Sequence, residues 1–419
     1  MSKIYLDCTH TYNSGLNTGI QRVVKNIVKN IPSISLELDE SIIPITTQNA
    51  TYLKFDEFPK INIKNTNLKT ILKNIYIKVR KISSYLLPKK LHDIFYSPRL
   101  NIFLSTTLDK LFFAKKLDKH NEIILNDGDT LILMDAIWLH NDYEKLKQLK
   151  KNNIKIIAII YDIIPLSHPQ FCSIDLTNFL KDWYKNSTEY ISGFISISKT
   201  VQEDIYNYLK NNIDVNIEHK KFDYFYLGAK FSENIPTTSS HISKEYQQIF
   251  QTQDVYLSVS TIEPRKNHSY ILDSFSKLWT NNINAKCVFI GKIGWDVQEL
   301  ITKIKSHEEY NKRLFLLTEV DDDELVYAYK NSKALIFASY IEGFGLPIIE
   351  SLHYSLPVII SDIKIHREIA KDKATYFNLS DSNSLFSIIK SKKIKRVSNF
   401  TWQSWSDSTK ELIIKSRSL

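Results

Sequence analysis

Two glutamates in one short stretch are the first residues of this chain whose spacing suggests chemistry. Residues 340–351 read YIEGFGLPIIES, with Glu342 and Glu350 eight positions apart. Residues 334–338 (ALIFA), just before this stretch, are apolar throughout and predict a buried strand. Glu342 is therefore expected near the end of a strand, where open α/β sheets bind their ligands.

The residues between the two glutamates predict a turn followed by the start of a helix. Gly343 and Gly345 permit backbone geometries that turn N–H groups toward a ligand. Pro347 is typical of the first turn of a helix, so a helix N-terminus would face the same point. Glu350 would then lie about one turn into that helix, where a carboxylate can accept both hydroxyls of a ribose.

Two further loops are expected at the ends of strands. Residues 260–268 read STIEPRKNH and place Arg265 and Lys266 beside the start of a helix. Two cations next to helix N–H groups suit a diphosphate, which offers several acceptor oxygens. The N-terminal loop over residues 9–24 also precedes a helix, which Gly19 opens where a phosphate or a sugar could approach.

The second half of the chain alternates strands and helices with regular spacing. Apolar segments predict the strands, and apolar residues at helical spacing predict the helices between them. The predicted strands are residues 255–260, 285–291, 313–318, 334–338 and 357–361. Short apolar strands separated by helices indicate a parallel sheet that is covered on both faces.

The first half follows the same alternation less regularly, with predicted strands at 3–8, 130–134, 154–162 and 193–198. Residues 40–120 do not fit this pattern and are expected to form a basic insertion, and the polar stretch 230–254 is expected to link the halves. We therefore predict an α/β protein with two doubly wound, Rossmann-like domains facing a central cleft. The predicted domains are 1–235 and 236–400, followed by a C-terminal helix at 401–419.

These motifs carry a family resemblance. EGFGLPIIES (342–351) resembles the E-x7-E motif of retaining nucleotide-sugar glycosyltransferases, which have the two-domain GT-B fold. TIEPRKNH and TGIQRVV resemble the forms found in a bacterial branch that builds lipopolysaccharide O-antigens and capsules. Similar pieces of that branch are GKIGW (291–295), YDIIPLSHP (161–169) and FTWQSWSDS (400–408). The resemblance spans nearly the whole chain and is weakest over residues 40–120.

The resemblance implies a role for each residue of these motifs. Glu342 would contact the transferred sugar, and Glu350 would hold the ribose. Lys266, helped by Arg265, would neutralise the diphosphate leaving group, and the last helix would cross back onto the N-terminal domain. The remaining donor contacts would come from the backbone of Phe344, Gly345 and Leu346, and from Thr318 and Val320 beside the nucleobase.

One departure from the resemblance affects the phosphate contacts. Many relatives carry an arginine six positions before the phosphate lysine, and this chain has Ser260 there. Arg265 is expected to take over that contact.

The expected mechanism depends on stabilising the departing diphosphate. No second carboxylate stands where a nucleophile would, so we expect front-face attack, with the leaving phosphate accepting the acceptor's proton. Asp162, at the end of the strand 154–162, is the N-terminal carboxylate expected near the sugar. Its alternative role is to cap the segment that follows.

Several other signals are better explained by local structure than by chemistry. Asp127 and Asp129 form a DxD pattern, but glycine and aspartate at this point predict a turn before a strand. Asp321–Asp323 coincides with a helix start and predicts capping. The histidines show no ligand spacing, His168 and His268 are interpreted as loop residues, and the three cysteines are scattered. We expect no metal and no cofactor besides the donor.

The charge of the chain bears on its partners and location. Net charge is +9, and residues 60–119 alone hold 14 Lys and Arg against three Asp. Apolar residues at helical spacing lie between them, so this segment could rest on an anionic membrane face or pack on its own domain. The start MSKIYLDCTH has no apolar signal core, and the longest apolar run is too short to span a membrane. We expect a cytoplasmic protein that could associate peripherally with the inner face of the cytoplasmic membrane.

Together these observations predict a retaining, metal-independent hexosyltransferase. It would move a hexose or deoxyhexose from a nucleotide-diphosphate sugar, first GDP-mannose or dTDP-rhamnose, to a growing O-antigen or capsule. The acceptor would be a glycan or a lipid-linked glycan. A nucleotide-sugar epimerase of the same fold is the main alternative, and it would convert the free sugar nucleotide. A nucleic-acid-binding protein is less favoured, because the basic segment has no recognisable reader motif.

Overall fold

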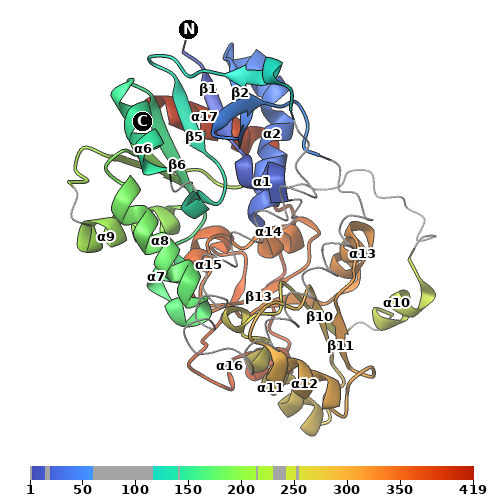
Figure 1. Ribbon diagram of the computed structural model, residues 1–419. Helices are drawn as coiled ribbons and strands as arrows, with labels where there is room; N and C mark the ends of the chain where they lie inside the picture. The colour runs from blue at the N-terminus through green and yellow to red at the C-terminus, as the bar shows by residue number, and fades with distance from the viewer. Residues whose placement is uncertain are drawn as a thin grey trace, which may run out of the picture.

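Two sheets, one in each half of the chain, form the frame of the molecule in the computed structural model (Figure 1). The structure describes residues 2–14, 19–59, 117–139, 142–213, 216–229, 242–251 and 254–419. Strand order is β4-β3-β2-β1-β5-β6-β7-β8 in the first sheet and β11-β10-β9-β12-β13-β14 in the second. The predicted α/β architecture is confirmed.

The first sheet is built around buried apolar strands. All paired neighbours are parallel except the β2–β3 and β3–β4 pairs. Its strands are β1 Ile4–Asp7, β2 Ile42–Gln48, β3 Thr51–Lys54, β4 Glu122–Ile123, β5 Thr130–Leu133, β6 Lys155–Ile160, β7 Gly193–Ser196 and β8 Lys221–Tyr224. The helices of this half are α1 Thr9–Ser14, α2 Gly19–Leu38, α6 Tyr143–Lys151, α7 Ile164–Ser167, α8 Ile174–Ser187 and α9 Lys199–Asn212, with short 3₁₀ turns at Lys119–Asn121, Ile137–Leu139 and Pro169–Phe171.

Residues 42–54 correct one expectation from the sequence. They were included in an insertion over residues 40–120, but β2 pairs with β1 in the middle of the first sheet and β3 pairs with β2. Pro44 and three polar residues interrupt the apolar pattern of β2, which explains why it was missed. Residues 60–116 of that range lie outside the described residues, and the membrane hypothesis falls almost entirely on them.

The second sheet is parallel throughout, as the sequence predicts. Its strands are β9 Val255–Val259, β10 Lys286–Ile290, β11 Leu314–Leu317, β12 Ala334–Phe337, β13 Val358–Ser361 and β14 Thr375–Phe377. Its helices are α10 Lys244–Ile249, α11 His268–Thr280, α12 Gln298–Ser306, α13 Asp322–Asn331, α14 Leu346–His353, α15 Lys364–Ala370 and α16 Ser384–Ser391, with a 3₁₀ turn at Pro264–Lys266. The expected boundary at 235/236 lies outside the described residues, between β8 and α10.

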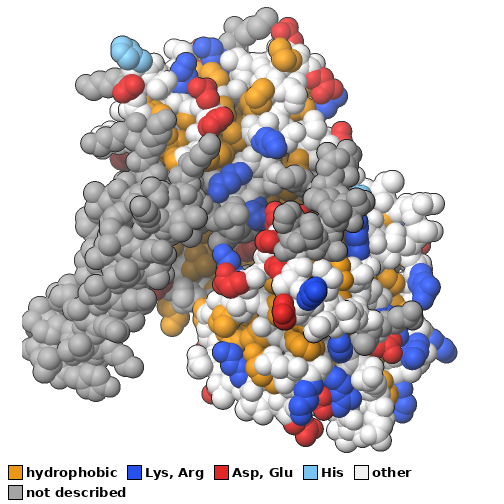
Figure 2. All heavy atoms as spheres, turned by 90° about the vertical axis from the view of Figure 1, so that its right-hand side faces the viewer, with side chains coloured by type: hydrophobic (Ala, Val, Ile, Leu, Met, Phe, Trp, Pro, Cys, Tyr) orange, Lys and Arg blue, Asp and Glu red, His pale blue; other side chains and the backbone are white. Residues whose placement is uncertain are grey.

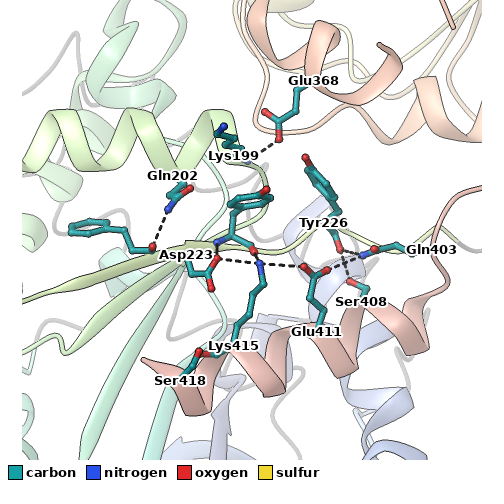
Figure 3. Close-up of polar contacts among 12 residues, drawn as sticks. Lys199, Gln202, Asp223, Tyr226, Glu368, Gln403, Ser408, Glu411, Lys415 and Ser418 are labelled. Carbon is teal, nitrogen blue, oxygen red and sulfur yellow. Dashed lines mark hydrogen bonds and ion pairs between the residues drawn. The ribbon is translucent and has the colours of Figure 1, made fainter. Parts of the chain in front are cut away.

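The last helix, α17 (Trp405–Ser418), returns to the first half of the chain and packs against α2 (Figure 1). Just before it, Trp402 donates its indole N–H to the carbonyl of Leu227 at 2.8 Å. A Cβ on Gly228 would lie 2.5 Å from the backbone of Trp405, so the C-terminal segment passes directly over that glycine. Figure 3 shows the ion pair of Lys415 with Asp223, whose nearest atoms are 3.0 Å apart.

Charged side chains are spread over both halves of the molecule. On the face shown in Figure 2, basic and acidic side chains of the described residues are interspersed. This agrees with the sequence, in which residues 60–119 account for the positive net charge. Within the described part of the chain, no helix is long and apolar enough to cross a membrane.

Candidate functional site

Sheet order brings two of the predicted loops together. Strands β9 and β12 are parallel neighbours, so the loops that follow them leave the same edge of the sheet side by side. The backbone N–H of Tyr340 donates to the carbonyl of Arg265 at 2.9 Å and joins the loops directly. The cations predicted for a diphosphate and the glutamate predicted for a sugar therefore lie in one place.

Glu342 is the centre of this cluster. Its Oε2 lies 2.7 Å from Nη1 of Arg265, and its Oε1 accepts a hydrogen bond from Nζ of Lys266. Nη2 of Arg265 also pairs with Oε1 of Glu263 at 2.8 Å. The side chains of Glu342, Lys266 and Arg265 are only 7%, 10% and 22% exposed, so these ion pairs are largely shielded from water.

The protonation of the cluster follows from burial and these partners. Burial alone would raise the pKa of Glu342, but Arg265 and Lys266 together hold it well below its usual range. Burial lowers the pKa of the Lys266 ammonium, and Glu342 opposes that shift. We conclude that Glu342 is ionised and that it neutralises part of the positive charge beside it.

The helix after Glu342 begins as the sequence predicts. Gly345 precedes α14 with φ +112°, a conformation that side-chain-bearing residues rarely adopt, and Leu346 and Pro347 are its first two residues. Gly345, the N-cap residue, has no side chain with which to cap this N-terminus. Its N–H groups therefore face the same edge of the sheet as the Glu342 cluster.

Glu350 lies one turn into α14 with two partners that the sequence did not reveal. Tyr329, from α13, donates its hydroxyl to Oε2 of Glu350 at 2.8 Å. Arg22, from α2 in the other half of the chain, places Nη2 3.9 Å from Oε1 of Glu350. Burial raises the pKa of Glu350, whereas Arg22 and Tyr329 lower it and favour the carboxylate.

Asp162, two residues after the end of β6, contacts both the start of α7 and the loop that carries Glu342. Its Oδ1 accepts the N–H of Ile164 at 3.0 Å, so it caps the start of α7. It also lies against the Glu342 loop, because a Cβ on Gly343 would be 3.2 Å from the Cβ of Asp162. Burial raises the pKa of Asp162, and Arg265 opposes this shift across the junction, the place where the loop after β6 meets the loops after β9 and β12.

The remaining predicted donor residues are more dispersed. Phe344 is buried, and its ring packs near those of Tyr226 and Trp402, with centroids 6.2 and 6.1 Å away. Gly19 is the first residue of α2, and a Cβ there would meet no atom of the described residues within 4 Å. Thr318 and Val320 follow the edge strand β11 and lead into α13, which carries Tyr329.

The signals attributed to local structure are explained by structural contacts. Asp129 accepts the N–H groups of Lys3 and Asn126 at 2.7 and 2.8 Å, and Asp321 caps α13 in a capping box with Glu324. His268 is not in a loop but is the buried first residue of α11, and burial, with a smaller effect of Lys266, lowers its pKa to about 3. Its Nε2 lies 3.3 Å from the hydroxyl of Ser260. Among the described residues no group of three or more His, Cys, Asp or Glu is placed to hold a metal ion.

Comparison with known proteins places this geometry in a family. The model of the family "Glycosyl transferases group 1" matches residues 240–411, which contain every element of the Glu342 and Glu350 site except α2, β6 and α7. Residues 240–411 form a group 1 glycosyl transferase domain. The glycosyl transferase domain thus supplies Arg265, Lys266 and both glutamates, and the N-terminal half adds Asp162 and Arg22.

Matches to two mannosyltransferases each cover 70% of this chain and so extend beyond the glycosyl transferase domain. The chain is 32% identical over 315 residues to the serotype-specific mannosyltransferase WbdA of Escherichia coli, covering 70% of this chain and 38% of that protein. It is 26% identical over 313 residues to the O-antigen chain mannosyltransferase RfbU of Salmonella typhimurium, covering 70% of this chain and 82% of that protein. The chain therefore spans little more than a third of the length of the WbdA that it matches.

Solved structures agree with the fold. HepE of Anabaena, in a complex with UDP and glucose, superimposes with a TM-score of 0.51 at 14% identity. The match covers 99% of this chain and 95% of that chain. The protein has the GT-B fold that the sequence motifs predict.

Proposed function

We propose that this protein is a glycosyltransferase that moves a mannosyl or related hexosyl group from a nucleotide-diphosphate sugar to a growing O-antigen glycan. The observation that carries the proposal is the Glu342 cluster. A buried carboxylate, two cations and an uncapped helix N-terminus converge where the loops after β9 and β12 meet. The mannosyltransferase relatives make GDP-mannose the first donor to test.

Each group in the cluster fits one part of a nucleotide sugar. Lys266, Arg265 and the N-terminus of α14 suit the diphosphate, because they offer charge and N–H donors at one point. Glu350 suits the ribose hydroxyls. Glu342 and Asp162 offer acceptor oxygens for sugar hydroxyls on opposite sides of the junction.

The proposed reaction retains the anomeric configuration. The bond from the anomeric carbon to the diphosphate oxygen breaks, and the acceptor oxygen attacks the same face. The leaving phosphate takes the acceptor's proton, so no enzyme base is required. Lys266 and Arg265 contact the leaving group and stabilise the charge that develops on it. We propose that these cations stabilise the leaving group without a metal ion.

The test is a product assay followed by nuclear magnetic resonance. Purified protein is incubated with GDP-mannose, UDP-glucose or dTDP-rhamnose and a short mannose-containing acceptor, with and without EDTA. We expect GDP release and a new glycoside from GDP-mannose with its anomeric configuration retained, at the same rate in EDTA. Inverted product would overturn the retaining mechanism, and loss in EDTA would overturn metal independence. Conversion of the sugar nucleotide without an acceptor would favour the epimerase.

We also propose that the protein works in the cytoplasm and meets a lipid-linked acceptor at the membrane. The basic segment 60–119 motivates this proposal. Flotation with anionic liposomes, with and without residues 60–119, tests it. Loss of flotation on deletion is the expected result, and undiminished flotation by the deletion variant would remove the basis of the proposal.

A further inference from the structure

The charges of the Glu342 cluster nearly cancel one another. Arg265 and Lys266 supply two cations, and Glu342 and Glu263 supply two carboxylates in direct ion pairs with them. Ser260 faces His268, and neither adds charge, since burial keeps that ring neutral. A nucleotide-sugar diphosphate is an anion whose charge grows as the sugar–oxygen bond breaks, so this cluster alone offers little net attraction.

Arg22 is a cation at the same junction with donors to spare. It lies in the first turn of α2, which begins at Gly19, and its side chain is 53% exposed. It forms an ion pair with Glu350, one turn along α14 from the N-terminus at Gly345. A ligand that reaches from that N-terminus to Glu350 therefore passes the guanidinium of Arg22.

The contact between Arg22 and Glu350 is loose compared with those of the Glu342 cluster. Its nitrogen–oxygen distance is 3.9 Å, against 2.7 Å between Arg265 and Glu342. A guanidinium has five N–H donors, and within the described residues a single long contact, to Glu350, leaves most of those of Arg22 available. The base of the side chain is held firmly, because its neighbour Gln21 is buried and α2 packs along α17.

We propose that Arg22 is a donor-binding residue supplied by the N-terminal half, which contacts the diphosphate of the bound nucleotide sugar. This inference rests on the proposed function and adds a residue to its donor site. Because Arg22 and Lys266 come from opposite halves of the chain, tight donor binding requires both halves to be in place. A planar guanidinium can bind phosphate oxygens in pairs, which an ammonium cannot.

The experiment compares nucleoside diphosphates with their nucleosides by calorimetry. Wild-type protein, Arg22→Gln, Arg22→Lys and the control Lys29→Gln are titrated with GDP, UDP and dTDP, and with guanosine, uridine and thymidine. Lys29 is an exposed cation on the same helix, so its loss matches the change in net charge. Thermal unfolding of each variant confirms that the fold is kept.

We expect Arg22→Gln to weaken the preferred diphosphate about 10- to 100-fold, as for a lost charge-assisted hydrogen bond. Arg22→Gln should bind the nucleoside as tightly as wild type does, and Lys29→Gln should bind the diphosphate as tightly as wild type does. Arg22→Lys should recover part of the lost diphosphate affinity. Unchanged diphosphate affinity in Arg22→Gln, or an equal loss for nucleoside and diphosphate, overturns the inference alone. Failure of wild-type protein to bind any diphosphate overturns the proposed function and the inference with it.

Discussion

Glu342 holds its charge in a buried position through ion pairs with two cations. Glu342 is buried, yet its pKa lies well below the usual range because Arg265 and Lys266 surround it. Removing one member of such a buried ion pair leaves the others uncompensated. The same contacts fix the two cations where the loop after β9 meets the loop after β12.

We expect Glu342→Gln to lower both stability and activity. The free energy of unfolding should fall by about 3 kcal/mol, because two buried cations lose their carboxylate. Sugar transfer should fall on the order of 10²–10³-fold. Denaturant titration and initial rates measure the two effects separately.

The same variant has a defined pH signature. The folded-state pKa of Glu342 is depressed, so its ionised form stabilises the fold above the ordinary value of 4.5, and this contribution is lost as pH falls below it. Glu342→Gln should therefore lose less stability than wild type as the pH is lowered from about 5 toward the depressed folded-state pKa of Glu342. An identical acid profile in both proteins would mean that the ion pairs do not form.

We expect Tyr329→Phe to weaken nucleoside diphosphate binding about tenfold, through loss of one hydrogen bond to the Glu350 carboxylate. Tyr329 lowers the raised pKa of Glu350, so the variant should lose affinity at a higher pH than wild type as the solution is acidified. Calorimetry across pH measures both effects. The control is Tyr327→Phe on the same helix, whose ring packs near Tyr246 and Phe250. A binding profile of Tyr329→Phe equal to that of the control would refute the role.

At the scale of elements, the site depends on loops from different strands approaching closely. A Cβ on Gly343 would lie 2.2 Å from the carbonyl oxygen of Tyr161, which follows β6. The carbonyl of Gly343 in turn accepts the hydroxyl of Ser198 at 3.0 Å, at the start of α9. The strand ends of both sheets thus meet at one glycine.

We expect Gly343→Ala to separate the two loops and to reduce transfer by at least tenfold, because the added methyl clashes with backbone rather than with a flexible side chain. Its unfolding temperature should fall, whereas that of Gly19→Ala should not, since a methyl on Gly19 meets no atom of the described part of the chain within 4 Å. Equal rates and unfolding temperatures for Gly343→Ala and wild type would contradict this close approach.

Hydrogen bonds between α9 and α15 form a second contact between the two halves of the chain. The carboxylate of Glu368 on α15 accepts the backbone N–H of Lys199 at 2.7 Å (Figure 3). It also accepts the N–H of Thr200 at 2.8 Å, so one half caps a helix of the other. We expect Glu368→Ala to cost about 1–2 kcal/mol of unfolding free energy, as for other lost caps. Lys364→Ala, which breaks an exposed pair with Glu203 nearby, should cost less than about 0.5 kcal/mol. Equal costs in denaturant titration would argue against capping.

At the scale of the whole molecule, α17 and the residues before it pack against the first half of the chain. The carbonyl of Tyr226 accepts hydrogen bonds from Gln403 and from Ser408 at 2.5 and 2.7 Å (Figure 3). Phe344, two residues after Glu342, packs near the rings of Tyr226 and Trp402. The returning segment therefore supports the loop that carries the central carboxylate.

The sequence predicted the parts of this molecule that local patterns encode. Each predicted strand is present. Short apolar runs such as 255–259 and 334–337 are buried at every position, as is typical of the strands of a parallel sheet that is covered on both faces. Strand β8 (KFDY) was missed because it is short and largely polar. Glycines, cations and glutamates at strand ends predicted loops that the structure brings together, and the binding roles of these residues stay predictions.

Contacts between distant residues could not be predicted in the same way. Arg22 and Tyr329 meet Glu350 only after both sheets have formed, and no spacing within α2 or α13 points to that carboxylate. Nor does a local pattern reveal that Arg265 and Lys266 are shared with Glu342 and Glu263, which changes the charge that a ligand meets. Their donor roles stay predictions until binding is measured.

The most direct test of a nucleotide-sugar site is a thermal-shift screen of wild type and Glu350→Ala against UDP, GDP, dTDP, ADP and CMP. We predict that one diphosphate, first GDP, selectively raises the unfolding temperature of wild type, and that Glu350→Ala loses this shift because the ribose contact is gone. No shift with any nucleotide, or an equal shift in Glu350→Ala, would contradict the account of the site.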